Sequence, residues 1–391
     1  MKKLSSLLDH MPPKGIGIVT EKAKKMEQEG AGDMIYMTSG RPDFDTPSYI
    51  KEACIQSLRS GNTSYTPTQG QLNLRTAIAD KLAEDYQLSY TADEVVVTSG
   101  LSEAVYDVLN ALVEEGDEVL LPDPCWPSYN GICHMLKAGI VEYSLQASND
   151  FQLSTKELEQ RITAKTKALV LITPHNPTGT VLTRETLEKI AALAQKYDFY
   201  VIADEIYNRI LYDDLEVPSI AALPGMKERT LTLNGFSKIY SMTGWRVGYV
   251  ASSPSLIKAV TAIHGYGSSC LPGFIQDACV TALQEEDESI AHMQAEYKKR
   301  RDYVFQAINE IDGLSCPKPT GAFYAWIDIH ALHMSAQEAS DFFMTKAHVA
   351  LVPGTVFGSV CGNTYLRMSY ATRLDVIKEA CRRMKAAVDA R

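Results

Sequence analysis

Short apolar runs alternate with amphipathic patterns along the middle of the chain. In one such pattern the apolar residues Leu187, Ile190, Ala191 and Ala194 recur at the spacing of one helical face, and Thr183 is placed to cap the helix. The apolar runs between these patterns are short and end in polar residues or glycine, as strands do. We expect strands at Glu94–Thr98, Glu118–Leu121, Ala168–Ile172, Tyr200–Ala203, Thr230–Leu233 and Val247–Ala251. This alternation predicts βαβ units, and therefore an α/β fold whose central sheet is mostly parallel and flanked by helices.

The last third of the chain has a different pattern. Residues Gln294–Ile311 have a long, charged, amphipathic pattern that predicts a helix, and Pro317–Gly321 predicts a turn. Strand patterns near Phe323–Ile327 and Leu366–Ser369 precede a final helix from Leu374. The change predicts a smaller α+β domain after an acidic stretch. The expected limits are residues 46–285 for the large domain and residues 286–391 for the small one.

The composition limits the size, the partners and the compartment. A chain of 391 residues is too long for one compact core, so two domains are expected. The net charge of −10 argues against nucleic acid or an anionic membrane as a partner. The 8 cysteines include no C-x-x-C pair and no neighbouring histidine cluster. They therefore predict free thiols in a reducing cytoplasm rather than a metal site or a disulfide framework.

The start of the chain lacks the pattern of a secretory signal. Residues 1–8 begin with lysines and turn apolar, but Asp9 and His10 end the apolar stretch far short of a signal-peptide core. No apolar run elsewhere approaches the roughly 20 residues of a membrane span. We therefore expect a soluble, cytoplasmic protein.

The segment from Ser237 to Arg246 carries the most informative chemistry. Lys238 follows an apolar, strand-like run, and a serine, a glycine and Arg246 come shortly after it. A lysine in a cleft forms an imine with a carbonyl compound, and an arginine grips a phosphate with its planar fork of donors. Imine and phosphate together indicate pyridoxal phosphate, held by Lys238 as a Schiff base.

Other candidate residues stand where predicted strands end, which is where open α/β sheets bind ligands. After the first of these strands, Gly100, Leu101 and Ser102 open a helix. They either offer backbone N–H groups to a phosphate or form an ordinary glycine turn with a serine cap. Asp204 ends another strand, and it either pairs with a pyridine nitrogen or caps a helix. Tyr207, three residues later, is placed to donate to a ring oxygen.

Three further residues have two interpretations each. Asn176, in a loop with two prolines, binds a ligand oxygen or belongs to a plain turn, and the neighbouring His175 is a weak candidate for a base. Trp126 stacks on a flat ring or belongs to the core. Arg367 lies in an alternating, strand-like run, where it binds a carboxylate or forms a surface salt bridge.

Together these segments resemble the fold-type I, pyridoxal phosphate-dependent aminotransferases of classes I and II, which include aspartate and aromatic aminotransferases. The resemblance runs in order from about Gly40 to Ala371. It implies a large domain with a mostly parallel sheet and a small α+β domain built from both chain ends, with residues 1–45 joining the small domain. It also implies a homodimer with shared active sites. The implied substrates of the enzyme are an L-amino acid and a 2-oxo acid.

The resemblance implies a role for each candidate residue. Lys238 corresponds to the Schiff-base lysine and proton shuttle, and Asp204 to the partner of the pyridine nitrogen. The implied contacts to the cofactor ring come from Trp126, Asn176 and Tyr207. The implied contacts to its phosphate come from Gly100, Leu101, Ser102, Ser237, Arg246 and, across a subunit boundary, Tyr65. The residues expected to meet the substrate are Gly40, Trp126, Asn176 and Arg367, which clamps the α-carboxylate. The same likeness implies a cis bond between Asn176 and Pro177.

The sequence departs from the family pattern in several places. Ser102 stands where some members carry a lysine linked to acidic substrates, and we find no second arginine to hold a side-chain carboxylate. Arg41 replaces the more usual acidic or amide residue. The segment from His264 to Cys270 is unusual at the place where the partner subunit is expected.

The predicted function is ping-pong transamination. The main alternative is a carbon–sulfur lyase that acts at Cβ on the same fold. The residues named so far hardly distinguish such a lyase from a transaminase. A non-catalytic binding protein has no need of Lys238, Asp204 and Arg367 together, and no G-x-G-x-x-G follows a strand as a nicotinamide dehydrogenase requires. A broad, aromatic or aliphatic substrate preference is expected rather than strict aspartate specificity. The apolar pocket candidates behind this expectation are Ile16, Ile18 and Phe323.

Overall fold

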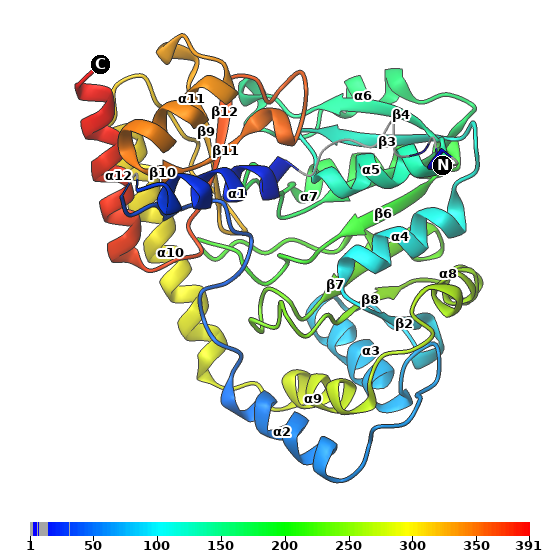
Figure 1. Cartoon of the computed structure of the whole chain (residues 1–391). Coiled ribbons are helices and arrows are strands. Elements are labelled where there is room, and N and C mark those ends of the chain that lie inside the picture. Colours follow the sequence, from blue (N-terminus) through cyan, green and yellow to red (C-terminus); the bar gives the residue numbers. More distant parts are fainter. Residues whose placement is uncertain (1–2, 6, 8–14, 31) are drawn as a thin grey trace.

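The computed structural model describes residues 3–5, 7, 15–30 and 32–391 (Figure 1). The expectation about a secretory signal falls on residues 1–10, most of which lie outside the described ranges. Within those ranges, no helix combines the length and the apolar character needed to cross a membrane.

A seven-stranded sheet forms the centre of the large domain. In spatial order its strands are β2 (Val95–Thr98), β8 (Gly248–Ala251), β7 (Thr230–Gly235), β6 (Tyr200–Asp204), β5 (Thr166–Ile172), β3 (Glu118–Asp123) and β4 (Gly139–Ser144). The five strands from β7 to β4 are parallel, and β8 runs antiparallel to both of its neighbours. The predicted mostly parallel α/β sheet is confirmed, and all six predicted strands form.

Alternate side chains of the strands enter different cores, because successive residues of a strand point to opposite faces. In β5, Val170 and Ile172 pack with α4 (Leu101–Leu112), α5 (Pro127–Leu136) and α8 (Pro254–Gly267). The neighbouring Leu169 and Leu171 pack with α6 (Thr155–Arg161) and α7 (Arg184–Tyr197). Both faces of the sheet are covered, which explains why the central strands are continuous apolar runs. Thr183 caps α7 as predicted, since its side chain accepts the Thr186 N–H.

Three further helices extend the large domain beyond the β2 edge of the sheet. They are α2 (Ser48–Arg59), α3 (Leu72–Tyr86) and α9 (Gly273–Gln284), and they lie together at the bottom of Figure 1. Side chains from α3 and α9 share one core with Val95 and Val97 of β2. The segment between α2 and α3 contains Tyr65, whose side chain is 95% exposed.

The small domain combines both ends of the chain. Its antiparallel sheet has the order β11 (Val352–Pro353), β12 (Tyr365–Ser369) and β9 (Tyr324–Asp328). Near the N-terminus, β1 (Ile35–Tyr36) pairs in parallel with β10 (Val349–Ala350). The helices around them are α1 (Gly15–Gln28), α10 (Glu288–Asn309), α11 (Ala336–Phe342) and α12 (Leu374–Asp389). The predicted long and final helices are confirmed, although α10 begins earlier than expected because Asp287 accepts the Ser289 N–H at 2.9 Å.

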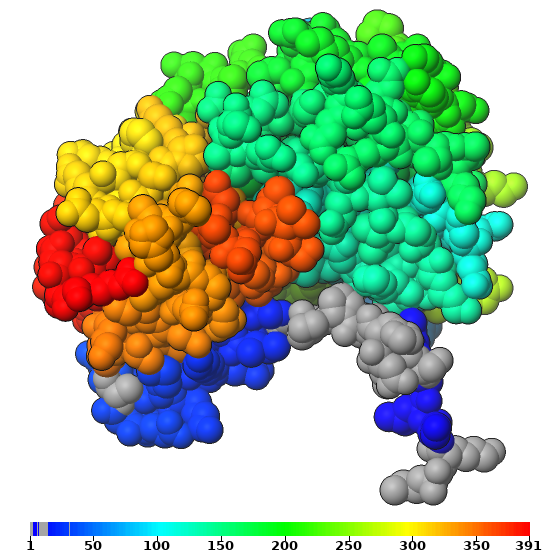
Figure 2. All heavy atoms as spheres, turned by 90° about the horizontal axis from the view of Figure 1, so that it is seen from above, coloured from blue at the N-terminus to red at the C-terminus, as the bar shows by residue number. Residues whose placement is uncertain are grey.

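We propose that the domain limits lie where the sequence places them, at residues 46–285 and 286–391, with residues 1–45 joining the small domain. The gap between α9 and α10 contains the second limit. The two parts touch through the segment after β11, which appears orange-red against green atoms in Figure 2, and Cys125 N–H donates to the Phe357 carbonyl at 2.7 Å.

Candidate active site

A cavity of about 160 Å³ lies where the parallel strands β5, β6 and β7 end. Eleven of the predicted site residues line it, namely Gly40, Leu101, Ser102, Trp126, Asn176, Asp204, Tyr207, Ser237, Lys238, Arg246 and Arg367. The remaining lining residues are Ile16, Ile172, Ile206 and Tyr324. Segments from both ends of the chain therefore meet at the edge of the sheet where ligands of this fold class bind.

Lys238 reaches this cavity from the turn that follows β7. Its Nζ donates to the Gly40 carbonyl oxygen at 2.7 Å. Burial lowers the pKa of Lys238 to about 8, and the positive charges of Arg367 and Arg246 act in the same direction while Asp204 opposes them. An amine with this pKa is partly uncharged near neutral pH, which a nucleophilic lysine requires.

Asp204 ends β6 and is 3% exposed. Its carboxylate accepts the Tyr129 hydroxyl at 3.0 Å and the Ile206 N–H at 3.3 Å. Burial raises the pKa of Asp204 to about 6, although these two donors and Lys238 lower it in part. The described chain forms a turn rather than a helix after this residue, so the helix-cap interpretation is wrong. A buried carboxylate with few partners is a place for a cationic ligand group.

Arg367 is 1% exposed, which excludes the surface salt bridge considered from the sequence. Its guanidinium donates to Asn176 Oδ1 at 3.0 Å and to the Thr38 carbonyl at 2.7 Å. The rings of Tyr324 and Phe357 lie 4.5 Å and 4.7 Å from its Cζ atom. Among the described residues no carboxylate pairs with it, and its buried Nε has no hydrogen-bond partner. A buried arginine with a free donor fits a carboxylate ligand.

The start of α4 forms a narrow cradle with Arg246. Gly100 caps the helix with a φ of 76°, and a Cβ at this position would lie 2.4 Å from Arg246 Nη2. A Cβ on Gly248 would lie 2.9 Å from the Leu101 nitrogen, so glycine is needed there as well. The helix cap is Gly100 and not Ser102, which is exposed and lines the cavity. Free N–H groups at a helix start beside an arginine and two serines form a donor set that fits a phosphate.

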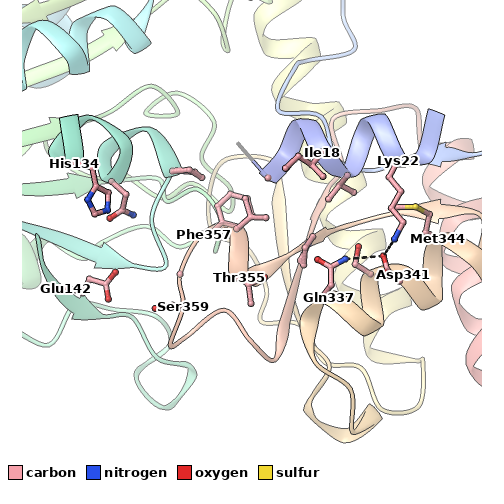
Figure 3. Close-up of a pocket in the computed structure, with 18 residues that line it drawn as sticks. Ile18, Lys22, His134, Glu142, Gln337, Asp341, Met344, Thr355, Phe357 and Ser359 are labelled. Carbon is pink, nitrogen blue, oxygen red and sulfur yellow. Dashed lines mark hydrogen bonds and ion pairs between the residues drawn. The ribbon is translucent and has the colours of Figure 1, made fainter. Parts of the chain in front are cut away.

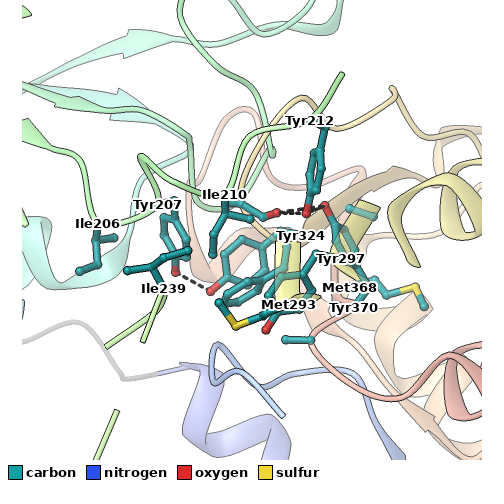
Figure 4. Packing of buried hydrophobic residues seen from close by; sticks show 14 of the residues in the cluster. Ile206, Tyr207, Ile210, Tyr212, Ile239, Met293, Tyr297, Tyr324, Met368 and Tyr370 are labelled. Carbon is teal, nitrogen blue, oxygen red and sulfur yellow. Dashed lines mark hydrogen bonds between the residues drawn. The ribbon is translucent and has the colours of Figure 1, made fainter. Parts of the chain in front are cut away.

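Tyr207 and Tyr324 line the cavity that Lys238 also lines, and Figure 4 shows their hydroxyl groups pointing toward each other. The hydroxyl oxygens of Tyr207 and Tyr324 lie 2.7 Å apart. A Cβ on Gly40 would lie 2.7 Å from the Tyr324 hydroxyl oxygen, which explains a glycine beside the lysine. Trp126 is half-buried at the start of α5, and its ring meets that of Tyr129 edge-on, at a centroid distance of 5.9 Å. It lines the cavity and also packs against the core, so the core interpretation of Trp126 is confirmed and its stacking on a ring stays a prediction.

Five residues considered from the sequence do not line this cavity, and one of them, Gly100, belongs to the cradle just described. His175 is buried behind it, its Nδ1 lies 2.9 Å from the Thr178 hydroxyl, and burial lowers its pKa to about 3. Phe323 packs behind Tyr207 instead of lining the cavity. Ile18 lines a separate cleft of about 410 Å³ between α1, α5 and α11 (Figure 3). Lys22, His134 and Asp341 line the same cleft. Tyr65 does not line the cavity of its own chain. The expected cis bond between Asn176 and Pro177 is confirmed.

Tyr129 and Tyr324 are site residues that we did not predict. Tyr129 follows Trp126 by three residues on α5, so the spacing on one helical face was an available signal. Tyr324 is the first residue of β9, and nothing in its local sequence distinguishes it from the buried Phe323.

Comparison with known proteins assigns the chain to a family. Residues 32–384 match the model of the family "Aminotransferase class I and II". This chain belongs to the class I and II aminotransferases. It is 41% identical to a putative aminotransferase, YugH, of Bacillus subtilis over 384 residues, which cover 98% of this chain and 97% of that protein. It is 38% identical to aromatic-amino-acid aminotransferase 2 of Thermococcus litoralis over 360 residues, 91% of this chain and 92% of the relative.

A solved structure gives the same assignment. The aspartate aminotransferase of Thermus thermophilus with maleate superposes with a TM-score of 0.94 at 34% identity, covering 99% of this chain and 100% of the other. The fold-type I architecture and the enzymatic function predicted from the sequence are thereby confirmed. The aminotransferase moves an amino group between an amino acid and a 2-oxo acid, and the non-catalytic and dehydrogenase alternatives are excluded.

Proposed function

We propose that this aminotransferase works with pyridoxal phosphate bound in the cavity at the ends of β5, β6 and β7. The observation that carries the proposal is the convergence of Lys238, Asp204 and Arg367 on that one cavity. When bound, pyridoxal phosphate supplies a carbonyl carbon that takes up the amino group and a ring that accepts electrons released at the substrate Cα. Lys238 is the residue that holds this carbon.

The other assigned residues hold and orient the cofactor. Asp204 is the partner of the pyridine nitrogen, and its buried carboxylate keeps a proton there. The residues assigned to the ring are Trp126, Asn176 and Tyr207. The residues assigned to the phosphate are Gly100, Leu101, Ser102, Ser237 and Arg246. Tyr129 and Tyr324 support this set, since they donate to Asp204 and contact Tyr207, respectively.

Lys238 also moves a proton during the reaction. With pyridoxal phosphate and an amino acid bound, the neutral amine of Lys238 would take up the proton of the substrate Cα and hold it for return to the reacting atoms. A positioned base of this kind contributes roughly 10²–10⁴-fold to the rate. Arg367 binds the substrate α-carboxylate, and Asn176 orients the guanidinium through the 3.0 Å hydrogen bond. The backbone of Gly40 closes beside the carboxylate.

We propose that the amino donor has a neutral side chain, aromatic or aliphatic. Among the described residues that line the cavity, Lys238, Arg246 and Arg367 carry the positive charges, and all three are assigned to the reaction or to the ends of the cofactor and substrate. None is left for a side-chain carboxylate. The apolar residues that remain to contact such a donor are Ile16, Leu101, Ile172 and Ile206.

We further propose a cytoplasmic homodimer in which Tyr65 completes the phosphate site of the partner. The supporting observation is that Tyr65 is 95% exposed in the single chain and that Tyr266, at the end of α8 in the unusual segment, is 97% exposed. Large aromatic side chains with this exposure are typical of interfaces.

An absorbance spectrum tests this function directly. The purified enzyme is measured before and after each of a panel of L-amino acids is added. A band near the edge of the visible range that moves to the near ultraviolet with an aromatic or aliphatic amino acid is the expected result. A band that persists while pyruvate and ammonia accumulate points to the Cβ lyase instead. The absence of any band after pyridoxal phosphate is added would overturn the proposal.

Replacing the lysine provides the matched test. The Lys238→Ala variant is expected to lose turnover while its fold is retained, since the side chain lines a cavity and forms one hydrogen bond. Turnover close to that of the wild type would remove Lys238 from the proposed role.

A further inference from the structure

His264 occupies the last turn of α8 in the segment that departs from the family pattern. It is fully buried, and its Nδ1 lies 3.4 Å from Glu103 Oε2 and 3.4 Å from Asp107 Oδ2. The two carboxylates are four residues apart, so they lie on the same face of α4. An imidazole from one helix thus sits between two acids of another.

The charges of this cluster favour a protonated imidazole. Burial alone lowers the pKa of His264, but Asp107 and Glu103 outweigh this effect and raise it to about 9. Asp107 is fully buried, and among the described residues neither its oxygens nor the imidazole nitrogens of His264 have a hydrogen-bond partner, so the 3.4 Å contact between them is one of charge. The buried carboxylate of Asp107 beside the partly buried carboxylate of Glu103 would be strongly unfavourable without a cation, so His264 supplies the balancing charge at neutral pH.

Glu103 connects this cluster to the turn that begins α4. Its carboxylate accepts the Ser99 N–H and the Ser268 hydroxyl, both in short hydrogen bonds. The carbonyl oxygen of the same Ser99 accepts from Arg246 Nη2 at 3.4 Å. Ser99 directly precedes Gly100, so a continuous set of contacts runs from the buried imidazole to both sides of the cradle assigned to the phosphate.

We propose that His264 is a positioning residue for the phosphate subsite: as a cation it holds Glu103, which in turn fixes the Ser99–Gly100 turn and the arginine across from it. This role rests on the proposed use of pyridoxal phosphate. It predicts that the cluster contributes to the affinity for the phosphate group and not to the affinity for the ring. Outer contacts of this kind around a charged site are worth about 10- to 100-fold in affinity at metal centres, and about tenfold is expected here.

The test compares two cofactor forms that differ in the phosphate alone. Full-length enzyme freed of cofactor is titrated with pyridoxal phosphate and with pyridoxal, and binding is followed by absorbance. His264→Gln is expected to bind pyridoxal phosphate about tenfold more weakly and pyridoxal with unchanged affinity. Lys258→Gln is the matched control, because it removes a charge from an exposed position of the same helix. It should leave both affinities unchanged.

A second variant covers the case in which His264→Gln does not fold. The charged groups acting on the imidazole are Glu103 and Asp107, both from α4. Glu103 also accepts hydrogen bonds from the Ser268 hydroxyl, just after α8, and from the Ser99 N–H, just after β2. The wild type should lose its preference for the phosphorylated form as the pH rises through about 9, because His264 then loses its proton. In Asp107→Asn the same loss should occur at lower pH. An unchanged pH profile would overturn the proposal.

Four other outcomes also decide whether the proposal stands. Equal weakening of both cofactor forms would mean a purely structural role. A stoichiometric divalent metal in the wild type that is missing from His264→Gln would mean a metal site, since the three ligand atoms lie within 4.8 Å of one another. Unchanged binding of both forms by His264→Gln would overturn this proposal alone, whereas a wild type that binds neither form would overturn the proposed function itself.

Discussion

Asp204 is proposed to serve the cofactor through a buried charge, and burying that charge destabilises the fold. Burial raises its pKa from 3.8 to about 6, so the folded apoenzyme holds a proton more tightly than the unfolded chain does. Its stability must therefore fall as the pH rises from about 4 to about 6, and stay lower above that range. The difference in pKa corresponds to about 3 kcal/mol.

Asp204→Asn should consequently stabilise the apoenzyme at pH 8 while weakening the binding of pyridoxal phosphate. We expect the melting temperature without cofactor to rise by a few °C, because the amide keeps the shape of the carboxylate without its charge. Thermal unfolding with and without cofactor measures both effects. The control is Asp80→Asn on an exposed position of α3. A lower melting temperature of apo-Asp204→Asn at pH 8 would contradict the pKa assigned to this residue.

Arg367 should tolerate no replacement by lysine. A lysine keeps the positive charge but loses the planar fork that reaches Asn176 and Thr38 at once. We expect Arg367→Lys to lower kcat/KM by about a hundredfold or more, in the range for breaking a buried charged contact. KM should rise for both the amino acid and the 2-oxo acid, and the cofactor absorbance should not change.

Steady-state kinetics of Arg367→Lys beside Arg373→Lys checks this prediction. Arg373 is exposed just before α12, so its replacement should be silent. A normal KM in Arg367→Lys would mean that another group binds the α-carboxylate.

Among single residues, the sequence allowed us to predict those whose chemical type alone indicates a function. A lysine, an arginine and an aspartate at strand ends are unusual enough to be noticed one by one. Tyr129 and Tyr324 were missed because tyrosine is common in cores, and what distinguishes these two is the partner. The hydroxyl of Tyr129 meets Asp204, 75 positions away, and that of Tyr324 meets Tyr207, 117 positions away. Such contacts depend on the packing of separate elements.

The junction of β2 and α4 is the element on which the phosphate site depends. Gly100→Ala should reduce the affinity for pyridoxal phosphate, since the new methyl group would lie 2.4 Å from Arg246 Nη2 and displace it. Strain from the positive φ adds about 1–2 kcal/mol of instability. Cofactor content after purification and thermal unfolding measure the two effects.

Gly116→Ala is the matched control for this element. Gly116 has a φ of 96° and no atom within 4 Å of the Cβ position, so it carries the same type of backbone strain without a steric clash. It should lose stability and keep its cofactor. If Gly100→Ala kept its cofactor as well as Gly116→Ala does, the present position of Arg246 would not be needed for binding the cofactor.

Elements with a continuous apolar run were predictable because burial on both faces demands such a run. β4 was missed for the opposite reason. It lies at the edge of the sheet, its residues are mostly half-buried, and its sequence contains Gly139 and Glu142. Its place in the sheet comes from pairing with β3, which no local pattern reveals.

The proposed assembly of two chains concerns the whole molecule, and an activity assay can test it. If Tyr65 serves the partner's site, co-expression of Lys238→Ala with Tyr65→Ala should restore activity that neither variant has alone. Random pairing gives about half mixed dimers, each with one intact site, and so about a quarter of the wild-type activity at limiting cofactor. Because Tyr65 is 95% exposed, its replacement should not disturb the fold of its own chain.

Activity assays on the co-expressed and separately mixed variants make the comparison. Activity that equals the sum of the separate variants would place Tyr65 outside the partner's site. A monomer on size-exclusion chromatography would dismiss the shared site altogether.

The hydrogen bond from Arg367 to the Thr38 carbonyl joins positions 329 residues apart. During translation, every residue assigned to the cofactor, from Tyr65 to Arg246, leaves the ribosome before Arg367 is made. The proposed carboxylate clamp thus forms late in synthesis, because it needs Thr38 and Arg367 together. A nascent chain that stops before Arg367 lacks the proposed clamp and should not turn over its amino acid.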